Sequence, residues 1–209
     1  MYRQGTLEEY VDDAAAKKPA PGGGSVSALA GALAAAMSEM SANFTAGKKK
    51  FAAVEDRIRE MLEALAGCRD ALLGLTDRDV QAYGAVDEAY SMPRDTEDEK
   101  AARRQATNAA LRGAMQAPLE VMRQCARVSA IAEELADIGN PNLITDVGVS
   151  AILAEAACAA ARLNVEVNLK FLRDSGLQEA TAAEMDSLTH GVEECRESVA
   201  GKVAAYLAG

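Results

Sequence analysis

The sequence predicts an all-α protein, a single-domain bundle of about six to eight helices. Hydrophobic residues make up 49% of the chain and aromatic residues only 4%, so Ala, Leu, Val and Met must build the core, and small side chains suit close helix packing. A Thr followed three residues later by a Glu, the capping-box signature, occurs at residues 6, 96 and 181. No parallel-sheet pattern is present. A chain of 209 residues supports one substantial core and shows no linker, so residues 1–209 are expected to form one domain.

The first two helices are separated by a turn-rich segment. The capping box at Thr6 opens a helix that is expected to end at Lys17 or Lys18, where a proline follows. The segment PAPGGGS comes next, and its Ser25 is the expected N-cap of an Ala-rich helix that runs to Thr45.

The middle of the chain predicts three further helical runs. One is expected over residues 51–76 and another over 79–91, which the Met92-Pro93 pair ends. The third begins after the capping box at Thr96, is bent or interrupted at Pro118, and continues to Ile138.

The last third of the chain predicts two long helices after a turn. The turn is GNPN at 139–142, and the apolar run 143–172 follows it. Residues 163–169 alternate with a period of two, as a strand does, but a lone strand would have no partner, so a helix is expected. The capping box at Thr181 predicts a final helix to about Leu207.

Composition also excludes several classes of protein. The chain has 32 acidic and 22 basic residues and a formal charge of −10, which argues against a basic nucleic-acid binder. The N-terminus has neither the basic nor the apolar region of a secretory signal, so we expect a cytoplasmic location. The weakly polar run 25–45 is interrupted by polar residues and predicts a buried core helix rather than a membrane span.

The residues that usually bind metals or act as nucleophiles are sparse. His190 is the single histidine, and the four cysteines are far apart in sequence without a CxxC pair, so neither a zinc site nor a Ser-His-Asp arrangement is predicted. The three consecutive glycines lack the spacing of a nucleotide-binding loop. Proton transfer in an enzyme of this composition would depend on carboxylates, Lys, Tyr or bound water.

The clearest motif lies in residues 19–51, PAPGGGSVSALAGALAAAMSEMSANFTAGKKKF. It resembles the signature of the cyclodeaminase domain of the formiminotransferase-cyclodeaminase family, which includes stand-alone methenyltetrahydrofolate cyclohydrolases. Later pieces are similar to the family's motifs in the family's order: DVQAY at 79–83, APL at 117–119, GNPNLITDVG at 139–148 and NVEVNL at 164–169. The resemblance therefore covers nearly the whole chain.

The resemblance implies an all-helical homodimer that binds a reduced folate and acts on the one-carbon unit bridging its N5 and N10 atoms. It implies no cofactor beyond the tetrahydrofolate substrate, and no nucleic-acid or membrane partner is expected. Two reactions fit: a cyclodeaminase that releases ammonia and forms methenyltetrahydrofolate, and a cyclohydrolase that converts methenyltetrahydrofolate to 10-formyltetrahydrofolate. A non-catalytic folate-binding or structural helical oligomer is the alternative, because Ala-rich helices also pack between subunits.

Folate carries an anionic glutamate tail and a cationic one-carbon group. The cluster Lys48, Lys49 and Lys50 can pair with tail carboxylates in an otherwise acidic chain, although a solvated helix end explains it equally well. The segment Pro21, Gly22, Gly23, Gly24 and Ser25 lets backbone approach a flat ligand and offers free N–H groups at a helix start, although a structural turn explains it almost as well.

Two aspartates and three asparagines complete the candidate site. Under the resemblance, Asp146 faces the amidinium and relays a proton, with Asp79 as the second candidate, and a helix cap is the simpler explanation of each. Asn164 and Asn168 are four residues apart, so their amides share one helix face and suit the donor and acceptor edge of a pterin; hydrogen bonding between helices explains them as well. Asn142 in the GNPN turn is a further substrate-binding candidate.

Overall fold

The computed structural model describes residues 2–172 and 174–209, apart from the side chains at positions 79, 80, 81 and 83. Within these residues the chain forms seven α-helices and no strand, which confirms the predicted fold class. The helices are α1 (Leu7–Ala15), α2 (Gly23–Asn43), α3 (Glu55–Ser91), α4 (Glu97–Ala114), α5 (Gln116–Ile138), α6 (Ile144–Phe171) and α7 (Ser175–Ala208). Short 3-10 turns, η1 (Tyr2–Gln4), η2 (Lys49–Val54) and η3 (Pro141–Leu143), precede α1, α3 and α6.

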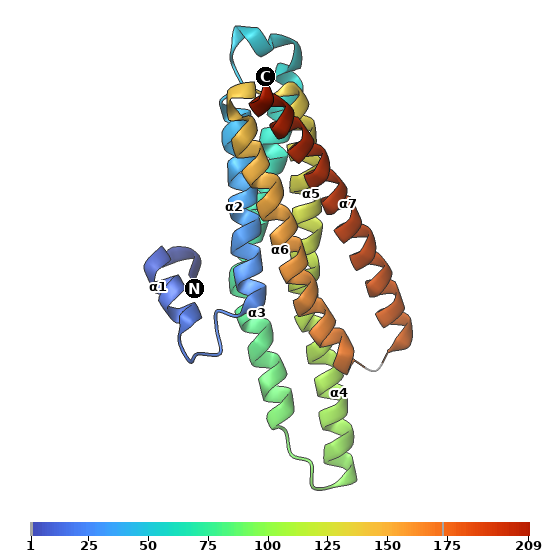
Figure 1. The fold of residues 1–209 in the computed structure, drawn as a ribbon. Coiled ribbons are helices and arrows are strands. Elements are labelled where there is room, and N and C mark those ends of the chain that lie inside the picture. The colour runs from blue at the N-terminus through green and yellow to red at the C-terminus, as the bar shows by residue number, and fades with distance from the viewer. Residues whose placement is uncertain (1, 173) are drawn as a thin grey trace.

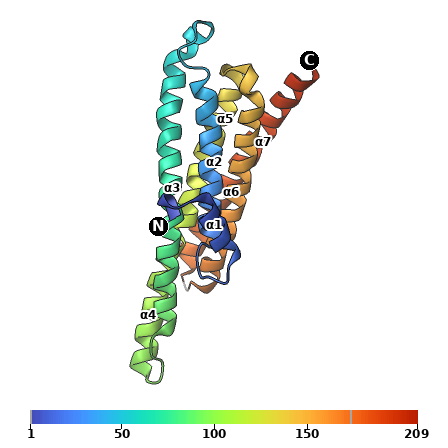
Figure 2. The ribbon, with the colours of Figure 1, turned by 90° about the vertical axis from the view of Figure 1, so that its left-hand side faces the viewer.

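The helices form an elongated bundle with α2 and α6 packed side by side at its centre (Figure 1). α3 flanks α2, while α5 and α7 flank α6. α4 folds back along the lower part of α3, and α5 continues toward the upper end, so the tip made by α3 and α4 projects below the other helices (Figure 2). α1 lies on the outside of the bundle near the lower end of α2.

Small side chains allow α2 and α6 to approach closely. Ala35 and Ala154, one from each helix, are completely buried. A short polar chain crosses the contact: the Ser38 hydroxyl donates to Ser150 Oγ at 2.7 Å, and Ser150 donates to the carbonyl oxygen of Ala34 at 2.7 Å. Each hydroxyl thereby gains a partner, which removes the cost of burying it in an apolar contact.

Two of the three predicted capping boxes form. Thr6 and Thr96 each accept a backbone N–H from the third helical residue, and the glutamate there accepts the N–H of the threonine. The prediction at Thr181 is wrong, because α7 begins earlier, at Ser175. Asp174 caps this helix by accepting a backbone N–H at 3.0 Å, and Thr181 is a buried residue inside it.

Of the two helix breaks predicted in the middle of the chain, the structure contradicts one. Residues 51–91 do not form two helices, because α3 runs without interruption from Glu55 to Ser91 after the turn η2. No proline lies between those ends, and the buried face continues through Leu72 and Leu75. The interruption expected near Pro118 does occur: α4 ends at Ala114 and α5 begins at Gln116, so Pro118 is the third residue of α5, where its missing N–H needs no partner within the helix.

Among the described residues, one segment, Pro141–Phe171, has the length and apolar composition of a membrane span. It consists of η3 and α6, and α6 packs against α2, α5 and α7 as a core helix does. The Ala-rich segment expected to be a core helix is α2, which packs against α3, α5 and α6.

Candidate functional site

A cavity of about 380 Å³ opens where the glycine-rich turn meets the lower halves of α3 and α6 and the last turn of α4. Apolar and aromatic side chains form most of its wall, and backbone of the turn and two amides supply the polar part. The lining residues are Pro19, Ala20, Gly22, Gly23, Ala82, Val86, Tyr90, Leu111, Ala114, Asn164, Val167, Asn168 and Phe171. A mostly apolar cavity with a few convergent polar groups is typical of small-molecule sites.

The glycine-rich turn brings the start of α2 to this cavity. Gly22 is the N-cap in extended backbone, and no described side chain caps the helix, so the first N–H groups of α2 are available to an acceptor on a ligand. The prediction that Ser25 is the N-cap is wrong. Ser25 is buried in the first turn of α2, where its hydroxyl lies 3.0 Å from that of Tyr10.

The two asparagines of α6 face the cavity together, as their spacing predicts. Asn164 Nδ2 donates to the carbonyl oxygen of Ala160 at 2.9 Å, and Asn168 Nδ2 donates to that of Asn164 at 2.8 Å. Among the described residues neither Oδ1 accepts a hydrogen bond, so both remain available to ligand donors. These amides do not bridge to another helix, which argues against a purely structural role.

Gly23 has a steric reason to be glycine that the sequence did not reveal. A Cβ at this position would lie 3.2 Å from Asn164 Nδ2, tighter than ordinary contact. The absent side chain therefore leaves room for the amide that lines the cavity.

Aromatic side chains stand where this cavity meets a second one. Tyr90 and Phe171 are 44% and 55% exposed, although both are large and partly apolar. They also line an adjoining cavity of about 390 Å³, whose other walls are Arg94, Lys100, Arg103, Arg104, Thr107 and Asn108. The two cavities therefore adjoin at these side chains, and the pair, one mostly apolar and one basic, is called the depression below.

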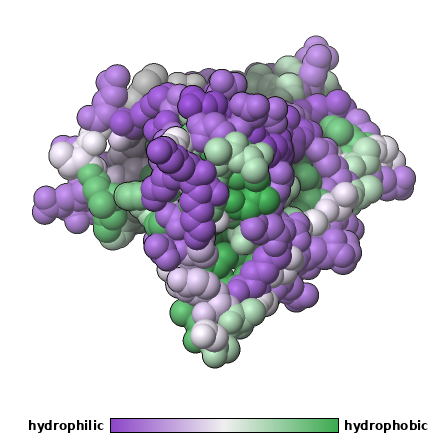
Figure 3. All heavy atoms as spheres, turned by 90° about the horizontal axis from the view of Figure 1, so that it is seen from above, coloured by the Kyte–Doolittle hydropathy of each residue, from purple (hydrophilic) through white to green (hydrophobic). Residues whose placement is uncertain are grey.

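Several predicted site residues lie far from this depression in the same chain. Lys48, Lys49 and Lys50 are exposed beyond the C-terminal end of α2, a helix of 21 residues, so roughly 30 Å separates them from the glycine-rich turn. Figure 3 looks onto this end of the bundle, where hydrophilic side chains surround a smaller apolar patch. Lys48 and Lys50 stand over the rings of Phe44 and Phe51 at 5.7 and 5.4 Å. Within one chain, these lysines cannot reach a ligand in the cavity.

Asp146 and Asn142 lie at the same distant end. Asp146 is in the first turn of α6, 18 residues before Asn164, which corresponds to roughly 27 Å along the helix. Within one chain, Asp146 therefore lies far from the glycine-rich turn. The backbone N–H of Asn142 donates to Asn140 Oδ1 at 3.2 Å, and Asn140 in turn donates to the carbonyl oxygen of Phe44. The GNPN turn thus ties the end of α2 to the start of α6.

Asp79 lies within α3, but its side chain is outside the described part of the structure. Pro21 and Gly24 are buried beside the lining residues without forming the cavity wall. The predicted residues that the structure brings together in one wall are therefore Gly22, Gly23, Asn164 and Asn168.

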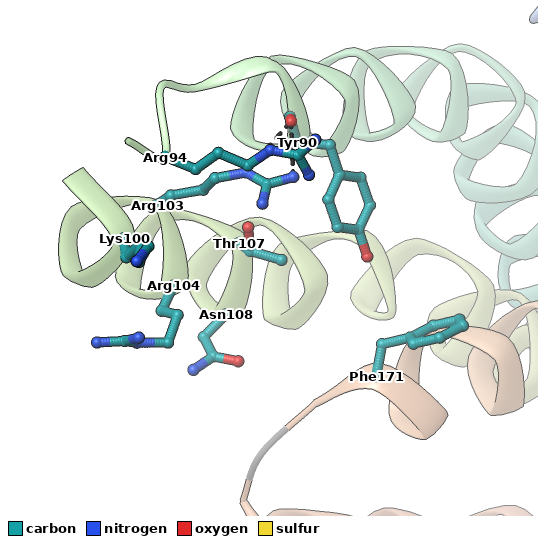
Figure 4. Close-up of a pocket in the computed structure, with 8 residues that line it drawn as sticks. All are labelled: Tyr90, Arg94, Lys100, Arg103, Arg104, Thr107, Asn108 and Phe171. Carbon is teal, nitrogen blue, oxygen red and sulfur yellow. Dashed lines mark hydrogen bonds between the residues drawn. The ribbon is translucent and has the colours of Figure 1, made fainter. Parts of the chain in front are cut away.

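Sequence reasoning missed the aromatic and basic part of the depression (Figure 4). Tyr90 was not among the predicted site residues, although its place just before Met92-Pro93 puts it at a helix end. Arg103 and Arg104 form a basic pair in a strongly acidic chain, which is the signal that could have identified this region. Phe171 gave no signal, because it lies within the apolar run 143–172, and the sequence does not show which of those residues face a cavity.

Comparisons with known proteins identify the family of the chain. A sequence model of the formiminotransferase-cyclodeaminase family matches residues 6–187. The chain is 41% identical over 183 residues to the methenyltetrahydrofolate cyclohydrolase of Methylorubrum extorquens, covering 88% of each chain. It is 30% identical to the formimidoyltransferase-cyclodeaminase of Mus musculus, of whose length it spans 37%.

A solved structure has the same fold. The crystal structure of a formiminotetrahydrofolate cyclodeaminase from Thermotoga maritima superposes with a TM-score of 0.90 and 31% identity, covering 99% of this chain and 100% of that one. The family match over most of the chain, together with these relatives, shows that the chain belongs to the formiminotransferase-cyclodeaminase family.

Proposed function

We propose that the protein is a methenyltetrahydrofolate cyclohydrolase, which adds water to 5,10-methenyltetrahydrofolate and forms 10-formyltetrahydrofolate. The observation that carries this choice within the family is the 41% identity to a cyclohydrolase over 88% of both chains. The cavity supports it, because amides, helix N–H groups and aromatic walls suit the polar edge and flat rings of a reduced folate.

In this proposal the side chains of α6 and the backbone of the turn orient the substrate. The free Oδ1 atoms of Asn164 and Asn168 accept N–H groups of the pterin, while the N–H groups at the start of α2 donate to its carbonyl oxygen. Tyr90 and Phe171 contact the aromatic ring that follows the pterin. Water then attacks the methenyl carbon, and the tetrahedral intermediate opens with loss of one proton.

The proton needs an acceptor, and the cavity lining that the structure describes contains no acidic side chain. Asp79, a candidate named from the sequence, is on α3 three residues before the lining residue Ala82 and seven before Val86. We therefore propose Asp79 as the proton relay from the same chain. Asp146 can act as the proton relay only if a second subunit supplies it to the cavity.

A homodimer is part of the proposal, and the outer surface of α2 and α6 supports it. α6 carries an exposed apolar stripe of Val149, Ile152, Leu163 and Val167, which are 44 to 66% exposed, and the neighbouring α2 adds Val26 and Leu33. Val167 also lines the cavity, so the site borders this stripe. If two copies pack antiparallel through it, the Asp146 end of one copy lies near the cavity of the other.

The test measures turnover of methenyltetrahydrofolate by the purified protein as the loss of its near-ultraviolet absorbance, corrected for the uncatalysed rate. We expect the enzyme to accelerate this loss and to form 10-formyltetrahydrofolate. Absence of acceleration with protein shown to be folded by circular dichroism would contradict the proposal. Folate binding without turnover would favour the non-catalytic alternative.

Cyclodeaminase activity is the second candidate, favoured by the close superposition on the Thermotoga maritima enzyme. Here N10 attacks the formimino carbon and the intermediate expels ammonia, so methenyltetrahydrofolate absorbance rises instead of falling. Assays of both substrates with the same preparation distinguish the two reactions, and ammonia release provides an independent measurement of the second.

A further inference from the structure

The glycine-rich turn, residues 19–25, lines the first cavity but contains few side chains that could fix its own conformation. Gly22, Gly23 and Gly24 are consecutive, and glycine loses more conformational freedom on ordering than any other residue. The first N–H groups of α2 keep one position only if neighbouring parts of the chain hold this turn. Two tyrosines from the start of the chain contact it, one near each end.

Tyr2 holds the beginning of the turn. Its hydroxyl donates to the carbonyl oxygen of Ala20 at 3.1 Å and to Asp13 Oδ2 at 3.0 Å. Ala20 itself lines the cavity, and among the described residues no backbone N–H donates to its carbonyl oxygen. Asp13 also pairs with Lys18. The connection between α1 and the turn is therefore tied at Tyr2.

Tyr10 holds the end of the turn. Its hydroxyl lies 3.0 Å from Ser25 Oγ, in the first turn of α2. Of the nine residues of α1, all of them described, Tyr10 alone is buried. The rings of Tyr2 and Tyr10 meet edge to face, with centroids 5.2 Å apart and planes at 84°. The two side chains thus form one unit, the tyrosine clamp, which contacts the turn at Ala20 and at Ser25.

The clamp takes its position from α3. The backbone N–H of Tyr2 donates to Asp77 Oδ1 at 2.9 Å, and Arg3 pairs with Asp70 at 3.7 Å. Figure 2 shows this N-terminal segment beside α3. Farther along, α3 carries the lining residue Val86. One wall of the cavity therefore fixes the clamp, and the clamp contacts the turn that forms another wall.

We propose that Tyr2 and Tyr10 are positioning residues, which hold the glycine-rich turn in the conformation that receives the substrate. This inference rests on the proposed function, because only there do the N–H groups of the turn contact the pterin. Neither tyrosine lines the cavity, so both act through the turn. Bound substrate itself orders the turn, so loss of the clamp lowers the competent fraction of the free protein and weakens binding, while turnover at saturation is kept.

Tyr2→Phe is the test variant, because it keeps the ring contact with Tyr10 and the backbone bond to Asp77 and removes only the hydroxyl. We expect the Kd of tetrahydrofolate, measured by calorimetry, and the KM of methenyltetrahydrofolate to rise about fivefold, as the loss of one hydrogen bond allows. The kcat is expected to stay within about twofold of the wild-type value.

Hydrogen exchange in the ligand-free protein measures the order of the turn directly. The backbone N–H of Val26 donates to the carbonyl oxygen of Gly22 at 3.0 Å, so its exchange rate, followed by NMR, reports on this turn. In Tyr2→Phe we expect Val26 to exchange about fivefold faster, while amides in the core helix α5 keep their rates.

Tyr206→Phe is the matched control, since it removes the same group elsewhere. Tyr206 is exposed in the last turn of α7 and lines neither cavity. We expect this variant to keep the wild-type Kd, KM and Val26 exchange rate. Tyr10→Phe, which loses the contact with Ser25, is expected to raise all three as Tyr2→Phe does.

An unchanged Kd or an unchanged Val26 exchange rate in Tyr2→Phe would overturn the proposal, even if the free energy of unfolding fell. A fall in kcat without a rise in KM, or an equal effect of Tyr206→Phe, would also overturn it. Absence of turnover by the wild type would instead contradict the proposed function. The Kd and the exchange rate would still decide this inference, because neither measurement requires catalysis.

Discussion

The amide of Asn164 occupies the space that a side chain at Gly23 would need. A Cβ on Gly23 would lie 3.2 Å from Asn164 Nδ2 and 3.3 Å from Oδ1. Asn164 is held in place by its hydrogen bond to the carbonyl oxygen of Ala160 at 2.9 Å. This contact joins the glycine-rich turn to α6, so the two motifs that are farthest apart in the sequence form one wall of the cavity.

Gly23→Ala is expected to weaken folate binding by about tenfold or more while the protein stays folded. The added methyl group pushes the Asn164 amide out of the position from which it contacts a ligand, and roughly 1.4 kcal/mol of lost interaction corresponds to a factor of ten. Calorimetric titration with tetrahydrofolate measures the loss. Wild-type affinity in this variant would show that the amide does not contact the substrate.

Gly67→Ala and Gly74→Ala serve as controls, because a Cβ at either position meets no atom within 4 Å. Both lie inside α3, where Ala stabilises a helix by up to about 1 kcal/mol relative to Gly. We expect both variants to bind folate as the wild type does and to unfold at higher urea concentration.

Asn168→Ala distinguishes a ligand contact from a structural one. The Asn168 amide bonds only to the carbonyl oxygen of Asn164 within its own helix among the described residues, so its loss should change the free energy of unfolding by less than about 1 kcal/mol. The KM should nevertheless rise several-fold. A large loss of stability with unchanged kinetics would instead indicate that Asn168 contributes to packing and does not bind the substrate.

Asp79→Asn is expected to abolish turnover while leaving folate binding within about threefold of wild type, because the amide keeps the size of the carboxylate but cannot accept the proton. Asp146→Asn has the same effect only if that residue serves the cavity of a second subunit. Turnover by Asp79→Asn at the wild-type rate would remove Asp79 from the mechanism.

Mixed dimers test whether the site is shared. Asp146→Asn and Asn164→Ala protomers are inactive alone if both residues are essential. In an antiparallel dimer, half of the mixed molecules combine the two variants, and each of these contains one intact site. Mixing is therefore expected to restore about a quarter of the wild-type activity. No recovery, with dimer exchange confirmed by mass spectrometry, would contradict the shared site.

The sequence was sufficient for most of the fold because helix ends have local chemical causes. Thr6 and Thr96 cap helices through bonds to residues only three positions away. Thr181 carries the same pattern but is buried inside α7, where tertiary packing outweighs the local signal. The same limit explains why α3 was divided in two: the second half of this helix packs against α4, and a local pattern does not report on that contact.

The site was predicted less completely, since it depends on which helix ends meet. Gly23, Asn164 and Asn168 were identified by residue type and do line one cavity. Lys48 was also assigned by residue type and Asp146 by the resemblance, but the long helices α2 and α6 carry them to the other end of the bundle. The periodicity of the sequence does not show at which end of a long helix a ligand binds.

The thiol of Cys158 gives a pH-dependent prediction. Burial raises its pKa to about 11, above the ordinary value of about 8.5. Below pH 8 the thiol is neutral in both the folded and the unfolded chain, so its titration does not affect stability. Between about pH 8.5 and 11 only the unfolded chain releases the proton, and the free energy of unfolding falls by up to about 1.4 kcal/mol per pH unit.

Cys158→Ala should therefore be less stable than wild type at pH 7, because it leaves a small cavity, but should lose less stability between pH 8.5 and 10. Urea unfolding at a series of pH values measures this, and parallel stability curves for the two proteins would show that Cys158 ionises as freely in the folded chain as in the unfolded one.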